Sequence, residues 1–210
     1  MQTLSSSLDL LWGNIGLAAV AALLFVAGLG TAGAVVRHGV RWLMVMPLWI
    51  VRHVMGLIAP GFPPVRVFLV IFLFNSIAIF IYMASGVLIV LPAAVAFLTG
   101  LNIGIIVLRS REMGLPAAQP SDGEPHEVPA WVGPCGLAVV ALELPCFWLA
   151  MAMGIRMGQQ LSRDYSLARL GELFLPRATA YLCVIVPTLL LSALAETAAI
   201  RGQISAQNDE

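Results

Sequence analysis

Charged residues are scarce in this chain, and lysine is absent altogether. Only 10% of the 210 residues are charged, the 11 basic residues are all arginine, and the formal net charge is zero. A protein that binds nucleic acid needs a strongly basic surface, so this composition argues against a nucleic-acid partner. Hydrophobic residues make up 60% of the chain, which indicates an integral membrane protein.

The residues that usually carry catalysis or bind metals are also few. The three histidines show no His-x-x-x-His spacing, and the sequence has no phosphate-binding glycine loop and no Ser/His/Asp set in a suitable context. We therefore expect no metal site, no cofactor and no enzymatic activity. The three cysteines lack Cys-x-x-Cys spacing and lie in or beside apolar runs, which predicts small buried packing residues: Cys135, Cys146 and Cys183.

Long apolar runs dominate what is present. Several exceed 18 residues and are continuous, not alternating, so helices, and not a barrel, are expected to cross the bilayer. The first run is too long for a cleaved signal peptide and is expected to be a permanent helix. The sequence predicts an all-α, polytopic transmembrane bundle in one domain, 1–210. The expected segments cover 13–36, 67–90, 92–108, 135–156 and 178–199.

A shorter amphipathic stretch, 41–58, is too interrupted to span and predicts a helix lying on the membrane surface. Arg41 and Arg52 share one helical face, and Trp42 and Trp49 are typical of the bilayer interface. This helix either couples the bundle to a cytoplasmic partner or anionic lipid, or serves only as a topological anchor.

The remaining connections are polar. Residues 1–12 predict a short polar lead, residues 109–134 an exposed loop, and residues 156–177 an amphipathic linker on a membrane face. Arginines lie on both sides of the fourth apolar segment, which conflicts with their preference for the cytoplasmic side. Either this segment spans and leaves its second arginine group outside, or it bends at Pro145 and returns.

The fourth segment contains a carboxylate, Glu143, followed closely by Pro145. An unpaired carboxylate near the bilayer centre costs at least ~2.5 kcal/mol, and proline frees the carbonyl four residues back. Glu143 lies roughly on one helical side with small residues, including Gly154 and Gly158, where another helix can approach closely. We expect a helix buried in the bundle, with Glu143 either protonated or hydrogen-bonded to Asn or Ser on a neighbouring helix.

Other polar residues lie within the apolar segments. Asn75 and Asn102 are expected to form interhelical hydrogen bonds, worth about 0.6–2 kcal/mol. The alternative, which we favour less, is that they contact a substrate. Thr188, Ser192 and Glu196 follow one another at four-residue spacing and form one polar stripe. Because Glu196 lies near the end of its segment, it is either part of a buried site or an interfacial carboxylate.

Small residues in the first segment have the spacing of helix-docking faces. The pairs Gly28/Ala32 and Gly30/Ala34 are each four residues apart. The alternative is the ordinary small-residue content of membrane helices. Over the whole chain the predicted packing glycines are Gly28, Gly100, Gly104, Gly154 and Gly158.

The order of these motifs resembles the stage II sporulation protein M family of polytopic membrane proteins. A small apolar run, then Glu143-Leu-Pro145, then Gly154-Ile-Arg-Met-Gly158 carries most of the resemblance. Asn75, the run 98–104 and the ending Ser192-Ala-Leu-Ala-Glu196 agree with it, so that it covers about 65–200. The family often has His-Gly shortly before Glu-Leu-Pro; residues 136–142 have no histidine, so its role cannot be transferred.

The resemblance implies a non-enzymatic membrane scaffold or accessory subunit of a larger membrane complex. The family's namesake works in a septal complex that remodels peptidoglycan. The alternative is a permease-like subunit of an ABC-type transporter, since the family resembles export-type membrane domains; this would require a separate cytoplasmic ATPase. A third hypothesis is a proton or small-ion path through Glu143 and Glu196. The expected partners are the lipid bilayer, other membrane subunits or further copies of the chain, in a prokaryotic cytoplasmic membrane.

Overall fold

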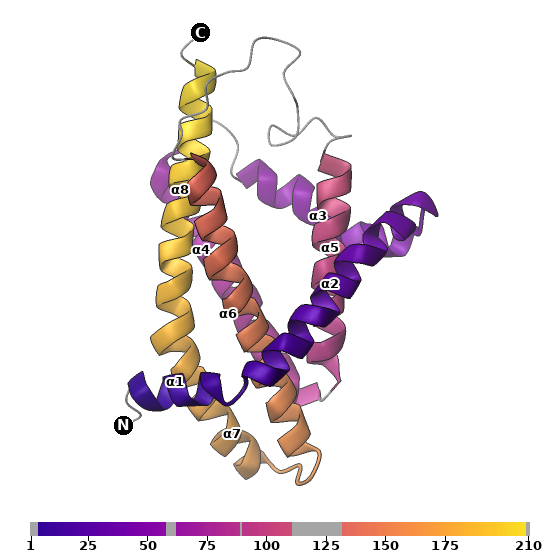
Figure 1. The fold of residues 1–210 in the computed structure, drawn as a ribbon, viewed down its shortest axis with the longest axis vertical. Coiled ribbons are helices and arrows are strands. Elements are labelled where there is room, and N and C mark those ends of the chain that lie inside the picture. The colour runs from indigo at the N-terminus through magenta and orange to yellow at the C-terminus, as the bar shows by residue number, and fades with distance from the viewer. Residues whose placement is uncertain (1–3, 58–61, 89, 111–131, 209–210) are drawn as a thin grey trace.

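The computed structural model describes residues 4–57, 62–88, 90–110 and 132–208, and these form helices and turns (Figure 1). Within them, five helical stretches are long and apolar enough to cross a membrane. The prediction of an all-helical bundle with five hydrophobic segments and one shorter helix is confirmed. The spanning stretches are α2 (Ile15–Arg37), α4 (Pro64–Ala84), α5 (Leu91–Ser110), α6 (Val132–Leu161), and α7 (Leu167–Ala180) joined to α8 (Val186–Asn208).

The bundle has two groups of helices. α4, α6 and α8 contact one another, while α2 packs along α5 (Figure 1). α6 joins the groups because it contacts α2 and α5 as well as α4 and α8. The main core lies around it and includes Phe25, Met83, Phe147, Met151 and Ile185.

α6 is one continuous helix of 30 residues, with Pro145 inside it. The structure therefore shows a continuous helix that is long enough to span, and not a segment that bends back at Pro145. Proline is tolerated within a membrane helix when its surroundings satisfy the freed carbonyl group. Since α6 runs the length of the bundle (Figure 1), the arginines beyond its end lie at the opposite end from those of 37–66.

α7 and α8 are joined by a π-helical turn, Tyr181–Ile185, in which the Val186 N–H bonds to the Tyr181 carbonyl five residues back. Pro187 follows at once and has no N–H to donate. The extra residue of the π turn shifts the hydrogen-bond register just before this proline, so the helix continues through it. The sequence predicted a linker at 156–177 followed by a separate last helix. The structure differs, because the final apolar stretch begins at Leu167 and reaches Gly202.

Two short helices lie outside the spanning set. The expected polar lead contains a helix, α1 (Leu4–Trp12), which buries Leu11 and Ser7 and packs on α7. α3 (Arg41–Leu57) follows α2 after a turn at Gly39, whose φ of 63° favours glycine. α3 lies across the direction of α5 (Figure 1) and packs on it.

The cysteines differ in environment. Cys146 is buried, Cys135 is half-buried and Cys183 is exposed, so the expectation of buried packing residues is wrong for Cys183, which faces outward from the π turn. Most of the loop expected at 109–134 lies outside the described residues, because the structure describes nothing between 110 and 132.

Candidate functional site

The centre of the candidate site is the Glu143 carboxylate on α6. Its Oε1 atom accepts one hydrogen bond from Asn75 Nδ2 on α4, at 2.8 Å, and another from Ser192 Oγ on α8, at 3.0 Å. Ser192 is fully buried, whereas Glu143 and Asn75 are half-buried. These three side chains, here named the Glu143 junction, tie α4, α6 and α8 together. The structure thus provides the Asn and Ser partners that the sequence analysis offered as one alternative.

Within the residues that the structure describes, two carboxylate groups at or near the Glu143 junction have an oxygen without a hydrogen bond. Among the described residues, the second carboxylate oxygen of Glu143 accepts no hydrogen bond. Glu196 lies one turn beyond Ser192 on α8, is half-buried, and has no hydrogen-bond or ion-pair partner in the described part of the chain. A further link between α4 and the start of α8 comes from the Tyr181 hydroxyl, which donates to the Ser76 carbonyl.

The predicted glycines of α2 and α5 form the contact between these helices. A Cβ on Gly28 would meet the Phe97 carbonyl, and one on Gly100 would meet the Phe25 carbonyl. At Gly104 it would meet the Ala32 side chain, 2.5 Å away. The backbones therefore approach more closely than any larger residue would allow.

Only one of the two small pairs in α2 acts in this way. Gly28 and Ala32 are buried against α5, whereas Gly30 has nothing within 4 Å of its Cβ position and Ala34 is exposed. The expected docking face is thus correct for Gly28/Ala32, and Gly30/Ala34 makes no such contact within the described chain.

The glycines of α6 lie toward its C-terminal half. Gly154 packs against the end of α4, where its Cβ position is 3.0 Å from the carbonyl oxygens of Tyr82 and Met83. Gly158 is also buried, near the turn into α7. Gly136, expected on the same small stripe, has nothing within 4 Å, so close packing along α6 is confined to the half that follows the Glu143 junction.

The other predicted residues are separate from the Glu143 junction. Asn102 on α5 donates from Nδ2 to Met46 Sδ on α3, at 3.7 Å, so it joins two different helices. Arg41 and Arg52 are exposed on α3. Pro145 follows Glu143 by two residues on α6, is exposed, and has no backbone N–H to donate.

Sequence reasoning missed the burial of Arg177, which it placed on an amphipathic linker at a membrane face. Its side chain is only 6% exposed. The guanidinium donates from Nε to the Met153 carbonyl on α6, at 3.2 Å, from Nη1 to the Leu173 carbonyl, and from Nη2 to Gln160 Oε1, at 2.8 Å. Leu173, Arg177 and Ala180 share one face of α7 by their spacing, but only the structure shows that this face is buried.

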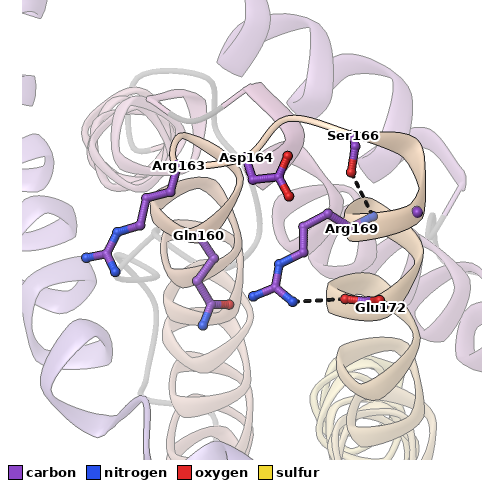
Figure 2. Close-up of a pocket in the computed structure, with 7 residues that line it drawn as sticks. Gln160, Arg163, Asp164, Ser166, Arg169 and Glu172 are labelled. Carbon is purple, nitrogen blue, oxygen red and sulfur yellow. Dashed lines mark hydrogen bonds and ion pairs between the residues drawn. The ribbon is translucent and has the colours of Figure 1, made fainter.

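A polar hollow of about 440 Å³ opens beside the turn from α6 to α7, away from the Glu143 junction. Figure 2 shows its side chains: Arg169 pairs with Glu172 at 2.9 Å, and the Ser166 hydroxyl accepts from the Arg169 N–H at the start of α7. Arg163 points away from this pair. The residues that line the hollow include two arginines, Arg163 and Arg169, and two carboxylates, Asp164 and Glu172, so the hollow carries no excess of one sign.

Comparison with known families agrees with the motifs that this geometry brings together. The family model of stage II sporulation protein M matches residues 21–199. The chain belongs to the stage II sporulation protein M family. The match begins well before residue 65, so α2 and α3 also belong to the family region of this SpoIIM-family chain. Comparison with curated proteins gave no match, and neither did comparison with solved structures.

In this SpoIIM-family protein, the Glu-Leu-Pro motif contributes the carboxylate that joins three helices. The two interhelical hydrogen bonds hold the carboxylate in place and lower the free-energy cost of burying it. The arrangement can fix the relative positions of α4, α6 and α8. It also leaves one carboxylate oxygen and Glu196 able to accept a proton or a cation.

Proposed function

We propose that this SpoIIM-family protein is a non-enzymatic scaffold or accessory subunit of a larger membrane complex, in a prokaryotic cytoplasmic membrane. The observation that supports this most is the Glu143 junction, where the polar side chains of three spanning helices bond to one another. A group that binds a substrate must exchange its partners during the cycle, whereas this carboxylate already holds an amide and a hydroxyl of its own chain.

The close packing of the helices supports the same proposal. Gly28, Gly100 and Gly154 each allow the backbone of one helix to lie directly against another. Such contacts depend on a fixed geometry, because interiors packed at this density do not deform continuously. A bundle with fixed helices suits a protein that presents its outer surface to other subunits.

The permease-like subunit remains the second candidate, and one observation favours it. α3 is a short amphipathic helix that lies across the bundle ahead of four further spanning stretches, as would suit a transport domain coupled to a separate ATPase. A broken fourth helix would also suit a transport domain, but α6 is continuous. The permease reading therefore has less support than it had from the sequence.

A pull-down of the tagged protein from its native membrane, in mild detergent and followed by mass spectrometry, tests the proposal. We expect stable recovery of other integral membrane proteins without an ATPase. Stoichiometric recovery of an ATPase would overturn the scaffold in favour of the permease. Recovery of the chain alone, as a homo-oligomer, would contradict both and would direct attention to proton or ion movement through Glu143 and Glu196.

A further inference from the structure

One face of α3 is apolar and uncovered. Trp42, Val45, Met46 and Trp49 recur at the spacing of a single helical face. They are 75%, 66%, 58% and 54% exposed. Isolated apolar residues on a surface need no explanation, but four adjacent large ones, two of them Trp, form a patch that requires an apolar neighbour.

The opposite face of α3 fixes the helix to the bundle. Leu43 and Met44 pack against the cluster formed by Ala32 of α2 and Leu101 and Ile105 of α5. Met46 lies at the border of the two faces: its side chain is 58% exposed, and its Sδ accepts a hydrogen bond from Asn102 of α5. Within the part of the chain that the structure describes, the apolar patch of α3 therefore faces away from the bundle.

Basic side chains lie at both ends of this patch. Arg41 begins α3 and Arg52 lies eleven residues later, about 16 Å along the helix at 1.5 Å per residue and on nearly the same face. Both are exposed. His53 stacks on Trp49 with ring centroids 4.7 Å apart.

The surrounding sequence has no acidic residue to balance these arginines. Between Asp9 and Glu112 the chain contains no Asp or Glu, yet it contains six arginines, of which four lie in or near α3: Arg37, Arg41, Arg52 and Arg66. Within the described residues, these four arginines form no ion pair with a carboxylate. Arg66 instead lies over the Phe62 ring, 3.7 Å from its centroid.

From these observations we infer that the exposed face of α3, with Arg41 and Arg52, is a binding surface for anionic phospholipid headgroups. The Trp side chains lie at headgroup level, with their rings in the upper acyl region. The unbalanced arginines supply the charge complementarity for lipid phosphate. The inference does not depend on the proposed scaffold function, because a transport subunit would use the same surface.

Fluorescence quenching of Trp42 and Trp49 by brominated lipids tests this. The purified protein is reconstituted into phosphatidylcholine vesicles that contain equal amounts of either brominated phosphatidylglycerol or brominated phosphatidylcholine. The signal of the other Trp residues is removed by subtracting a Trp42→Phe, Trp49→Phe variant. We expect stronger quenching by brominated phosphatidylglycerol, and a preference that weakens as salt is raised, since exposed charges are screened.

The decisive comparison removes equal charge at the two ends of the bundle. Each arginine near an anionic surface strengthens association roughly fivefold, so Arg41→Gln with Arg52→Gln should lower the phosphatidylglycerol preference roughly twenty-five-fold. Arg163→Gln with Arg169→Gln, at the far end, should leave it unchanged. Equal quenching by the two lipids in the unmodified protein would overturn the inference. A phosphatidylglycerol preference that survives the loss of both Arg41 and Arg52 would also overturn it. So would the absence of any quenching, which would indicate that protein, and not lipid, covers this face of α3.

Discussion

Glu143 Oε1 accepts hydrogen bonds from both Asn75 Nδ2 and Ser192 Oγ, although these partners lie 68 and 49 positions away in the chain. One carboxylate oxygen therefore joins α4, α6 and α8. In lipid, a polar side chain without a partner is costly, so three polar residues on three apolar helices have a strong reason to meet. The Glu143 junction thus specifies which helices are neighbours, while apolar packing supplies most of the contact area.

Substitution of Glu143 separates the acceptor role from the charge. Glu143→Gln keeps an oxygen in place of Oε1 and should melt close to the unmodified protein in detergent. Glu143→Leu removes the acceptor for both bonds and should lose about 1–2 kcal/mol, which corresponds to a few degrees in melting temperature. Equal melting of the leucine variant and the unmodified protein would show that the junction contributes no stability.

Gly28 and Gly30 form a matched pair on α2. Gly28→Ala places a methyl group against the Phe97 carbonyl of α5, and overpacking of this kind typically costs 1–3 kcal/mol. Gly30→Ala meets open space and should be neutral or slightly stabilising, because alanine favours helix. Thermal melting of both variants measures the difference. If the two substitutions have the same effect, the α2–α5 contact described above is incorrect.

Substitution of the buried Arg177 should destabilise the protein far more than substitution of the exposed Arg163. Arg177→Gln removes charged hydrogen bonds to Met153, Leu173 and Gln160, and a loss of about 1.5–3 kcal/mol is expected for bonds to a charged group. Arg163→Gln changes an exposed side chain and should stay within about 0.5 kcal/mol. The melting temperature, or the protease resistance of the α6–α7 turn, measures the loss of stability in each variant. An Arg177→Gln variant as stable as the unmodified protein would argue against the buried position of Arg177.

The continuous α6 predicts opposite membrane sides for its two ends. In a chain whose own cysteines are replaced, Gly133→Cys and Ser162→Cys lie at exposed positions near either end of the helix. A membrane-impermeant maleimide applied to intact cells should label one position only, and the other after permeabilisation. Labelling of both positions from the same side would support a segment that bends at Pro145 and returns.

Much of this architecture could be predicted from the sequence because the bilayer restricts the choices. Apolar runs of sufficient length must be helices, and Glu143 needed partners that only residues such as Asn75 and Ser192 could provide. The small residues at Gly28 and Gly154 likewise indicated close helix contacts.

Other features depended on three-dimensional contacts that no local pattern contains. Gly28/Ala32 and Gly30/Ala34 have the same spacing, and only the position of α5 distinguishes them. The last segment was expected to begin at residue 178, yet the π turn at Tyr181–Ile185 joins α7 to α8, so the apolar stretch begins at Leu167. Arg177 was taken as a surface charge because its burial requires Met153 and Gln160 of α6 to lie opposite it.

The most direct test of the account compares complexes recovered with the unmodified protein and with Glu143→Gln. Both tagged proteins are expressed at equal levels in the native membrane, extracted in mild detergent, and their partners are quantified by mass spectrometry. If the Glu143 junction is a structural joint in a scaffold, the same membrane partners should be recovered in the same amounts, with function in the cell retained. Normal assembly of the Glu143→Gln variant with an ATPase, together with complete loss of function, would instead identify Glu143 as a transport residue and contradict the account.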